Sequence, residues 1–245
     1  MTLSRSVLLA ALALALAPAA RADRRSFTRA YEYATQPGGN LEIEIWNDLT
    51  IPKESFAGTV AQPKFEIEVG ITDHWDLALY HAFESQIEEG RSTFRFDAWK
   101  LETRYRLFEK GELPVDLMLY LELERPADFR APAEVEEKLI IGKDLGRLGL
   151  IVNLVAEQKL GTDARSGHRF EVDAGARWEF MPALRVGVEY FVTLTSAPGA
   201  DLGVRHYLGP SVSVANAKVW LQAGAGVGLG DNSEVFVRSV LGFNL

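Results

Sequence analysis

The sequence of 245 residues contains no cysteine. Disulfide bonds, thiolate metal sites and a lipid anchor on cysteine are therefore excluded. Basic residues are also in short supply, because 26 Lys and Arg stand against 34 Asp and Glu and give a net charge of −8. Nucleic-acid binding requires a basic stripe, so this balance argues against a nucleic-acid partner.

Histidine is the next scarce residue type, with only His74, His81, His168 and His206 in the chain. No two of them have the spacing of metal ligands. Only His168 has a serine close by, in "RSGH", with Asp163 upstream. A nucleophilic site needs a histidine in contact with both the nucleophile and an orienting group. We therefore expect no catalytic residue, no metal site and no cofactor, and we do not expect an enzyme.

Long apolar runs are absent apart from one at the start of the chain. "MTLSRSVLLAALALALAPAARA" has a basic head at Arg5, an apolar run over residues 7–17, and small residues at Ala20 and Ala22. This run is shorter than the ~20 residues that a membrane-spanning helix needs. The pattern is typical of a secretory signal peptide, so we expect residues 1–22 to be removed by cleavage after Ala22.

The sequence is rich in alternation. "LEIEIW" (41–46) places a carboxylate at every second position among apolar residues, and "FEIEV" (65–69) and "FEVDA" (170–174) repeat this texture. Period-2 alternation is typical of β-strands. Most of the predicted strands have the ~9–11 residues that a tilted strand needs to cross a bilayer. The predicted strands are 40–50, 63–71, 74–83, 93–107, 114–124, 134–143, 147–159, 168–179, 184–194, 206–214, 219–229 and 234–245.

The connections between the predicted strands alternate in length. After the even-numbered strands they are short, as in "TD", "EKGEL", "DLG", "MPA" and "NAK", and after most odd-numbered strands they are longer, as in "PKESFAGTVAQ" and "ESQIEEGRS". Short turns at one end and long loops at the other are the layout of a membrane barrel with both termini in the periplasm. The expected fold class is therefore all-β, a transmembrane antiparallel up-and-down β-barrel of about 12 strands over residues 40–245.

A strand of such a barrel meets lipid on one face and a polar lumen on the other. Leu41, Ile43 and Ile45 are thus predicted to face lipid, while the glutamates between them face the lumen. About twelve strands lie between packed eight-stranded barrels and open barrels of sixteen or more, so a pore and a packed interior are both compatible with the sequence. The charged residues predicted to line the lumen are Glu42, Glu44, Glu66, Glu68, Arg95, Asp97, Glu102, Arg104, Arg106, Glu122, Glu124, Glu171, Asp173, Arg177, Glu189 and Arg238.

Aromatic residues gather near the ends of the predicted strands. Aromatic girdles at both membrane interfaces predict this distribution. Trp220 is an exception, since its register turns it inward, and a change of phase near Trp99 predicts a β-bulge. The residues predicted at the membrane interfaces are Trp75, Phe83, Phe94, Tyr105, Phe170, Trp178 and Phe243.

The last stretch, "VFVRSVLGFNL", places Val235, Val237, Leu241 and Phe243 on one face. It is similar to the C-terminal strand of Gram-negative outer-membrane β-barrel proteins, although those usually end in Phe and this chain ends in Leu245. "YEYATQPGGNLEIEIW" and "RFDAWKLETRYRL" also resemble a group of uncharacterised barrel proteins. The resemblance implies the outer membrane of a Gram-negative bacterium, contact with membrane lipid and lipopolysaccharide, and recognition of the last strand by the barrel-assembly machinery.

Residues 23–39 precede the first predicted strand and end in a flexible joint at Pro37, Gly38 and Gly39. We expect them to form a periplasmic segment or a small plug in the lumen. The leading functional hypothesis is a porin-like channel or transporter for small polar solutes, with a lean toward cations because acids outnumber bases on the inner face. The alternatives are a closed structural or surface-interaction barrel with functional loops and, third, an outer-membrane hydrolase.

Overall fold

The computed structural model describes residues 25–161, 167–196, 199 and 201–245, so the predicted signal peptide lies outside the described residues. Within this part of the chain, no helix is long and apolar enough to cross a membrane. The described secondary structure consists of strands. They are β1 (Leu41–Pro52), β2 (Thr59–Thr72), β3 (Trp75–Glu88), β4 (Arg91–Arg106), β5 (Asp116–Pro126), β6 (Ala133–Leu145), β7 (Leu148–Leu160), β8 (His168–Met181), β9 (Leu184–Ser196), β10 (Gly203–Ala215), β11 (Val219–Leu229) and β12 (Glu234–Asn244).

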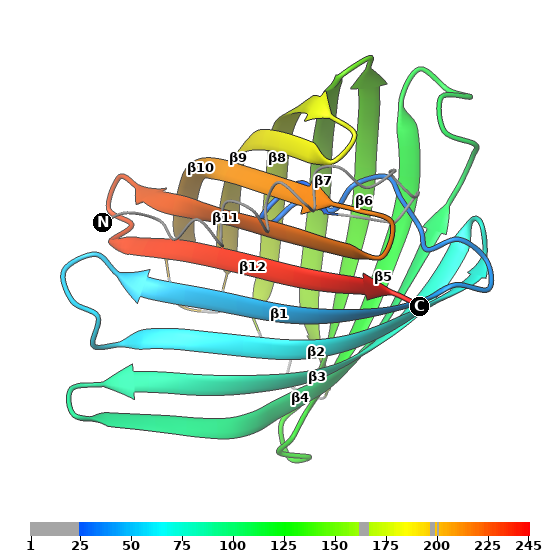
Figure 1. Cartoon of the computed structure of the whole chain (residues 1–245). Coiled ribbons are helices and arrows are strands. Elements are labelled where there is room, and N and C mark those ends of the chain that lie inside the picture. Colours follow the sequence, from blue (N-terminus) through cyan, green and yellow to red (C-terminus); the bar gives the residue numbers. More distant parts are fainter. Residues whose placement is uncertain (1–24, 162–166, 197–198, 200) are drawn as a thin grey trace.

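The strands form one closed barrel in which each strand pairs antiparallel with its neighbours in sequence, and β12 pairs with β1 (Figure 1). Eleven residue pairs join β1 to β12, and the backbone N–H of Leu245 donates to the carbonyl of Leu41 at 2.9 Å. Closure leaves no sheet edge exposed to unwanted pairing. The prediction of an all-β antiparallel barrel of about 12 strands is confirmed.

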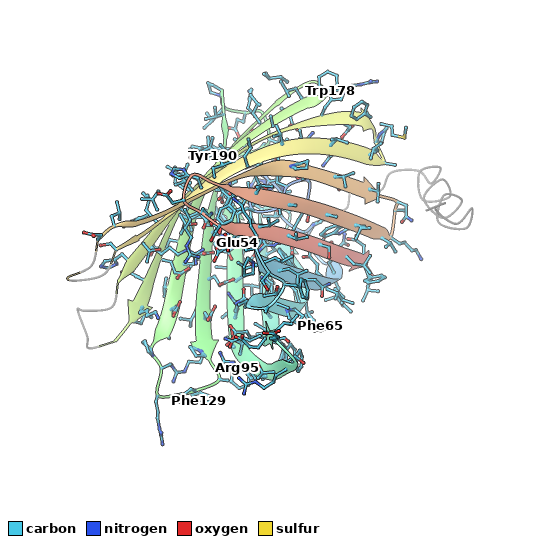
Figure 2. The ribbon with its side chains drawn as sticks, turned by 90° about the vertical axis from the view of Figure 1, so that its left-hand side faces the viewer. Glu54, Phe65, Arg95, Phe129, Trp178 and Tyr190 are labelled. Carbon is cyan, nitrogen blue, oxygen red and sulfur yellow. The ribbon has the colours of Figure 1, made fainter. Side chains whose placement is uncertain are left out.

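The alternation of the sequence becomes two faces of the barrel wall. On β1, Ile45 is 42% exposed, whereas the next residue, Trp46, is 1% exposed. Cross-strand pairing places polar residues opposite polar residues and apolar residues opposite apolar ones, since Glu44 lies opposite Glu66 and Ile45 lies opposite Phe65. Apolar side chains such as Phe65 and Trp178 therefore cover the outer wall (Figure 2), and the carboxylates point inward.

The two ends of the barrel differ from the sequence-based expectation in two hairpins. The predicted long loop over residues 84–92 is wrong, because β3 and β4 continue through it and turn at residues 89–90, where Gly90 has a φ of +70° that glycine tolerates. The predicted tight turn between β4 and β5 is instead a longer connection over residues 107–115. We call the end that carries residues 73–74, 107–115, 146–147, 182–183 and 216–218 the turn end. We call the opposite end the loop end; its described connecting residues are 53–58, 89–90, 127–132, 161, 167, 199, 201–202 and 230–233.

One irregularity interrupts the pairing of β3 with β4. Ala82 lies opposite Ala98 and Phe83 lies opposite Phe96, so Asp97 is the extra residue of a bulge. The bulge lies two residues before Trp99, where the change of phase was predicted. It turns Asp97 toward the lumen, where this side chain borders a cavity.

Residues 25–39, which we call the N-terminal segment, run inside the barrel and leave it at the turn end, where Gly38 and Gly39 are exposed (Figure 1, dark blue). Phe27, Ala30, Tyr31 and Tyr33 are buried and pack in one cluster with inward side chains of the wall. The wall residues of this cluster lie toward the turn end. They are Trp46, Ala78, Tyr80, Met118, Tyr120, Ile140, Ile151, Ala215, Trp220 and Val240.

Candidate functional site

The lumen has two unlike parts. Toward the turn end, the N-terminal segment and its cluster of wall side chains occupy the interior, and we call this part the filled half. Toward the loop end, a polar cavity of about 280 Å³ remains, and we call this part the vestibule. The lumen is the candidate site because it concentrates the charged side chains of the chain.

The charged residues predicted for the lumen all lie on the inner face. Arg95, Asp97, Arg106 and Glu124 are partly or fully exposed near the barrel ends, while the others are buried. Burial of so many charges is costly unless each one has a partner. The contacts of the buried set therefore decide what the lumen can do.

Glu189 on β9 holds the backbone of the N-terminal segment. Its carboxylate accepts the N–H groups of Thr28 and Arg29 at 2.9 Å and also the N–H of Ala30. Three successive N–H groups that converge on one anion form a nest. Hydrogen bonds to a charged group are roughly twice as strong as neutral ones, so Glu189 is a principal anchor.

Asn153 on β7 continues this anchor by one residue. Its Oδ1 accepts the backbone N–H of Tyr31 at 2.6 Å, and its Nδ2 donates to the carbonyl of Tyr31 at 3.0 Å. The side-chain amide thus pairs with the segment as a strand would. Phe27 fits against Gly175, where an added Cβ would lie 2.5 Å from its ring, so the wall is shaped for the segment.

The segment also supplies charges to the wall. Arg29 forms a two-pronged ion pair with Glu171, at 2.5 and 2.9 Å. Glu32 accepts from Arg177 at 2.8 Å. Arg25 lies 3.5 Å from Glu44 and stacks over the rings of Tyr31 and Trp46.

These contacts explain the glutamates of "LEIEIW". Glu42 accepts from Gln36 of the segment at 2.6 Å and from Trp220, while Glu44 faces Arg25. Glu66 accepts the indole N–H of Trp46 at 2.7 Å. The acids of β1 and β2 therefore act as acceptors for the segment and for buried indoles, in addition to making the lumen polar.

Three carboxylates, those of Glu44, Glu66 and Glu68, have oxygens within 4.8 Å of one another. Arg25 faces Glu44, and Arg104 donates to Glu68 and, at 2.8 Å, to Asp76. Arginines already provide the opposite charge here. We interpret this group as an ion-pair network rather than a metal site.

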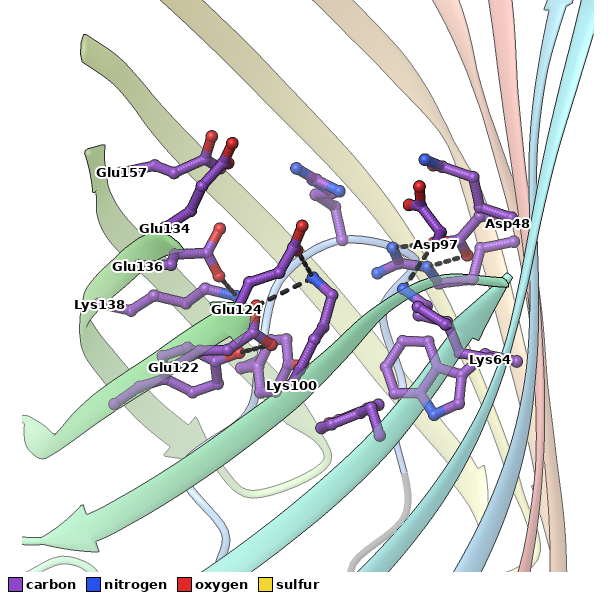
Figure 3. Close-up of a pocket in the computed structure, with 18 of the residues that line it drawn as sticks. Asp48, Lys64, Asp97, Lys100, Glu122, Glu124, Glu134, Glu136, Lys138 and Glu157 are labelled. Carbon is purple, nitrogen blue, oxygen red and sulfur yellow. Dashed lines mark hydrogen bonds and ion pairs between the residues drawn. The ribbon is translucent and has the colours of Figure 1, made fainter. Parts of the chain in front are cut away.

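The vestibule contains a mixture of charges (Figure 3). Asp48 binds Arg238 through two hydrogen bonds of 2.6 and 2.7 Å and Lys64 at 2.9 Å. On the opposite side, Lys100 lies 2.9 Å from Glu122 and 2.6 Å from Glu124. The lining includes seven Asp and Glu and six Lys and Arg, so its formal charge is 6 − 7 = −1. A weakly negative, hydrated cavity suits small polar solutes.

The list of lumen residues predicted from the sequence omits several residues of the site. Lys64, Lys100 and Lys138 point into the vestibule, and their even spacing from inward glutamates could have revealed them. Arg25 and Arg29 gave no such signal, because the N-terminal segment has no periodic pattern. The main partner of Arg29, Glu171, also lies 142 residues away along the chain.

The predicted interface aromatics lie on the outer wall. Trp75, Phe94, Tyr105, Phe170 and Trp178 are exposed, and Phe83 and Phe243 are half-buried. Phe83 stacks on Phe94 with ring centroids 5.4 Å apart and also borders the vestibule.

The histidines have ordinary neighbours. His74 contacts the carbonyl of Arg106 and the carboxylate of Glu109, and His206 contacts the hydroxyl of Tyr190 at 2.5 Å. His81 and His168 lie against phenylalanine rings. Asp163 lies outside the described residues.

No family model matches the chain, and a search of curated proteins gives no match. Solved structures do share its fold. The COG4313 outer membrane channel from Pseudomonas putida F1 has a TM-score of 0.68 at 13% identity, over 89% of this chain and 100% of that one. The KdgM porin has a TM-score of 0.57 at 8% identity, over 82% and 98%. The NanC porin has a TM-score of 0.58 at 8% identity, over 83% and 100%. At these identities the likeness shows the fold alone, which is that of outer-membrane β-barrel proteins.

Proposed function

We propose that the protein is a porin-like outer-membrane channel for small polar solutes, with the N-terminal segment as a plug that closes its lumen. The proposal is supported by a closed barrel with an apolar outer wall and a charged lumen. It is also supported by the names of the similar structures, which are a channel and two porins.

The orientation follows from the layout of membrane barrels. The turn end faces the periplasm and the loop end faces the cell exterior. After cleavage behind Ala22, the mature chain begins at Asp23, and Arg25 and the residues that follow it lie in the lumen. The vestibule is then open to the exterior, and the plug separates it from the periplasm.

The last strand carries a second part of the proposal. β12 closes the barrel against β1, so its insertion completes folding. We expect the barrel-assembly machinery to recognise this strand, and lipid and lipopolysaccharide to contact the outer wall.

The observation that carries the channel proposal is the attachment of the plug. Apart from its chain connection to β1, it is held by non-covalent contacts with the wall, chiefly the polar contacts to Glu189 and Asn153. Such contacts can exchange with water and solute. A closed lumen that can open is what a gated channel requires.

Planar-bilayer recording tests this function. We expect the purified full-length protein to show rare or small openings, and the Glu189→Ala/Asn153→Ala variant to show frequent, larger ones. Glu124→Ala/Gln62→Ala, which removes two inward side chains of the vestibule that do not hold the plug, is the matched control. Absence of conductance in both folded, heat-modifiable proteins would contradict a channel.

That negative result would favour the second candidate, a closed barrel whose loops bind partners at the cell surface. The specific observation behind it is the filled half itself, in which Met118, Ile140 and Trp220 are fully buried. A permanently packed interior would have this appearance.

A further inference from the structure

A second cavity adjoins the vestibule on the side of β8, β9, β10 and β12. Its volume is about 550 Å³, within the ~300–1,000 Å³ usual for small-molecule sites. We call it the aromatic pocket, because Phe191, Tyr207 and Phe236 line it. It lies at the loop end and shares Arg29, Gln62 and Arg169 with the vestibule, so these side chains separate two neighbouring spaces.

The three rings form one apolar wall. Phe191 and Tyr207 are stacked with centroids 4.6 Å apart, and Phe236 meets Phe191 edge-on at 5.9 Å. Phe191 is seated over Gly226, where an added Cβ would lie 2.9 Å from its ring. The inner face of a membrane barrel is ordinarily polar. Three grouped aromatic rings with an open space in front of them are suited to the flat face of a ligand.

Arginines surround the same space. Arg29, Arg169 and Arg205 line the pocket together with Glu171 and Asp201. Each arginine already has an acidic partner: Arg29 pairs with Glu171, Arg169 with Glu157 and Glu171, and Arg205 with Glu234. Arg205 is 61% exposed at its side chain and makes an ion pair of 3.1 Å with Glu234, outside the lining. A guanidinium has five N–H donors in a planar fork that matches a carboxylate. One ion pair leaves donors of Arg205 for a ligand.

The combination is local. The wall opposite, on β4 to β7, carries Glu122, Glu124, Glu134 and Glu136 with Lys100 and Lys138. Its acids outnumber its bases, whereas the exposed Arg205 keeps N–H donors that its one ion pair does not use. A carboxylate therefore meets like charges on the wall opposite and available donors at the aromatic pocket.

We propose that the aromatic pocket binds a small carboxylate built on a ring with an apolar face. A sugar acid and an aromatic acid both have this chemistry, since a sugar ring and a benzene ring can each lie flat on aromatic side chains. The inference deepens the proposed function, because it names the class of solute that the channel selects. It departs from the cation-leaning expectation, which considered the whole inner face rather than one pocket.

The test uses the full-length folded protein in lipid nanodiscs. Binding of D-glucuronate and of sodium benzoate is measured by calorimetry and by saturation-transfer NMR, with D-glucose and benzyl alcohol as neutral counterparts. We expect at least one acid to bind, and to bind more tightly than its neutral counterpart. Glucuronate alone would assign a sugar acid, and benzoate alone an aromatic acid. Binding of neither acid, or equal binding of acid and neutral compound, overturns the proposal.

Two variants locate the site. Arg205→Gln should weaken binding of the acid about fivefold, the effect of losing one exposed ion pair. Phe236→Leu should weaken it by a similar factor through loss of the aromatic face. Arg95→Gln is the matched control, because Arg95 is 64% exposed and paired with Glu84 at 2.8 Å on the other side of the mouth. Phe94→Leu is the control for the aromatic change. Equal weakening by variants and controls overturns the placement.

The outcome is separable from that of the channel proposal. Binding of an acid without conductance in any variant would support the proposed binding site and contradict the proposed channel function. Conductance without binding of either acid would support the proposed channel function and contradict the proposed binding site.

Discussion

The filled half and the vestibule are built from the same strands with the same alternation, yet they have opposite interiors. In the filled half, carboxylates such as Glu42 and Glu189 are satisfied by backbone and side-chain donors of the N-terminal segment. In the vestibule, Lys100 and Lys138 satisfy carboxylates of the wall, and space remains. A polar inner face therefore does not by itself define a pore. Whether the lumen is open depends on what occupies it, here the N-terminal segment.

The difference also predicts unequal tolerance to substitution. Close-packed interiors respond to the loss of a side chain by forming a cavity, whereas a side chain that borders solvent leaves no new void. The filled half should behave like a protein core, and the vestibule like a surface turned inward.

The largest effect should come from a buried ring of the filled half. Trp220 is fully buried and donates its indole N–H to Glu42. Trp220→Ala should reduce the free energy of unfolding by about 3–5 kcal/mol. Phe236→Ala, at the aromatic pocket, should cost less than half as much. Urea titrations in lipid vesicles measure both, and equal losses would show that the two parts are packed alike.

A charge on the outer wall should have the next largest effect. Leu119 is 46% exposed on the face predicted to meet lipid. Leu119→Arg should impair folding into vesicles by about 2–4 kcal/mol, the cost of an arginine near the bilayer midplane. Gln62→Arg, which points into the vestibule, should be nearly neutral. Met118, which precedes Leu119 in the chain, would be a poor control, because its inward side chain is fully buried in the filled half.

The third largest effect should come from a substitution that releases the plug. Glu189→Ala removes the acceptor of three successive N–H groups and should loosen the segment by about 1.5–3 kcal/mol, the worth of a hydrogen bond to a charged group. Hydrogen exchange at Thr28, Arg29 and Ala30 should then accelerate, while exchange in the strands is retained. Glu124→Ala should leave these amides protected. Unchanged exchange in Glu189→Ala would show that the segment is held by its apolar packing instead.

The smallest effect concerns ion preference. In the Glu189→Ala background, Glu124→Gln/Glu134→Gln should shift the reversal potential toward anions, because these acids border the vestibule. The shift should shrink from 0.1 M to 1 M salt, as the Debye length falls from about 10 Å to about 3 Å. Glu54→Gln/Glu112→Gln, on exposed connections, should have no effect. A shift of the reversal potential that does not depend on salt would indicate an altered structure rather than an altered electrostatic potential in the vestibule.

The strands were predictable because they obey one local rule. Period-2 alternation located each of them to within a few residues, and it identified Leu119 as outward and Glu42 as inward. The β3–β4 hairpin was misjudged because its ends are polar on both faces, so alternation fades although pairing continues from Gln86 with Thr93 to Glu88 with Arg91.

The interior was far less predictable. Glu66, Glu68, Glu171 and Asp173 have the sequence pattern of pore-lining residues, but they are buried, and Glu66 and Glu171 serve as acceptors for Trp46 and Arg29. The N-terminal segment has no periodic pattern, and its position depends on contacts with strands far along the chain. The aromatic pocket arises only when β8 to β12 are brought together.

The N-terminal segment fills one half of the lumen and leaves the other half open, and chemical labelling tests this directly. The chain has no cysteine, so single-cysteine variants report access without background. Ser26 is 1% exposed in the filled half, and Gln62 is exposed in the vestibule. Both Ser26→Cys and Gln62→Cys can be treated with a membrane-impermeant maleimide in intact liposomes. Fast labelling of Gln62→Cys, with Ser26→Cys protected until Glu189→Ala is added, is the predicted result. Equal, fast labelling of both single variants would contradict a filled half.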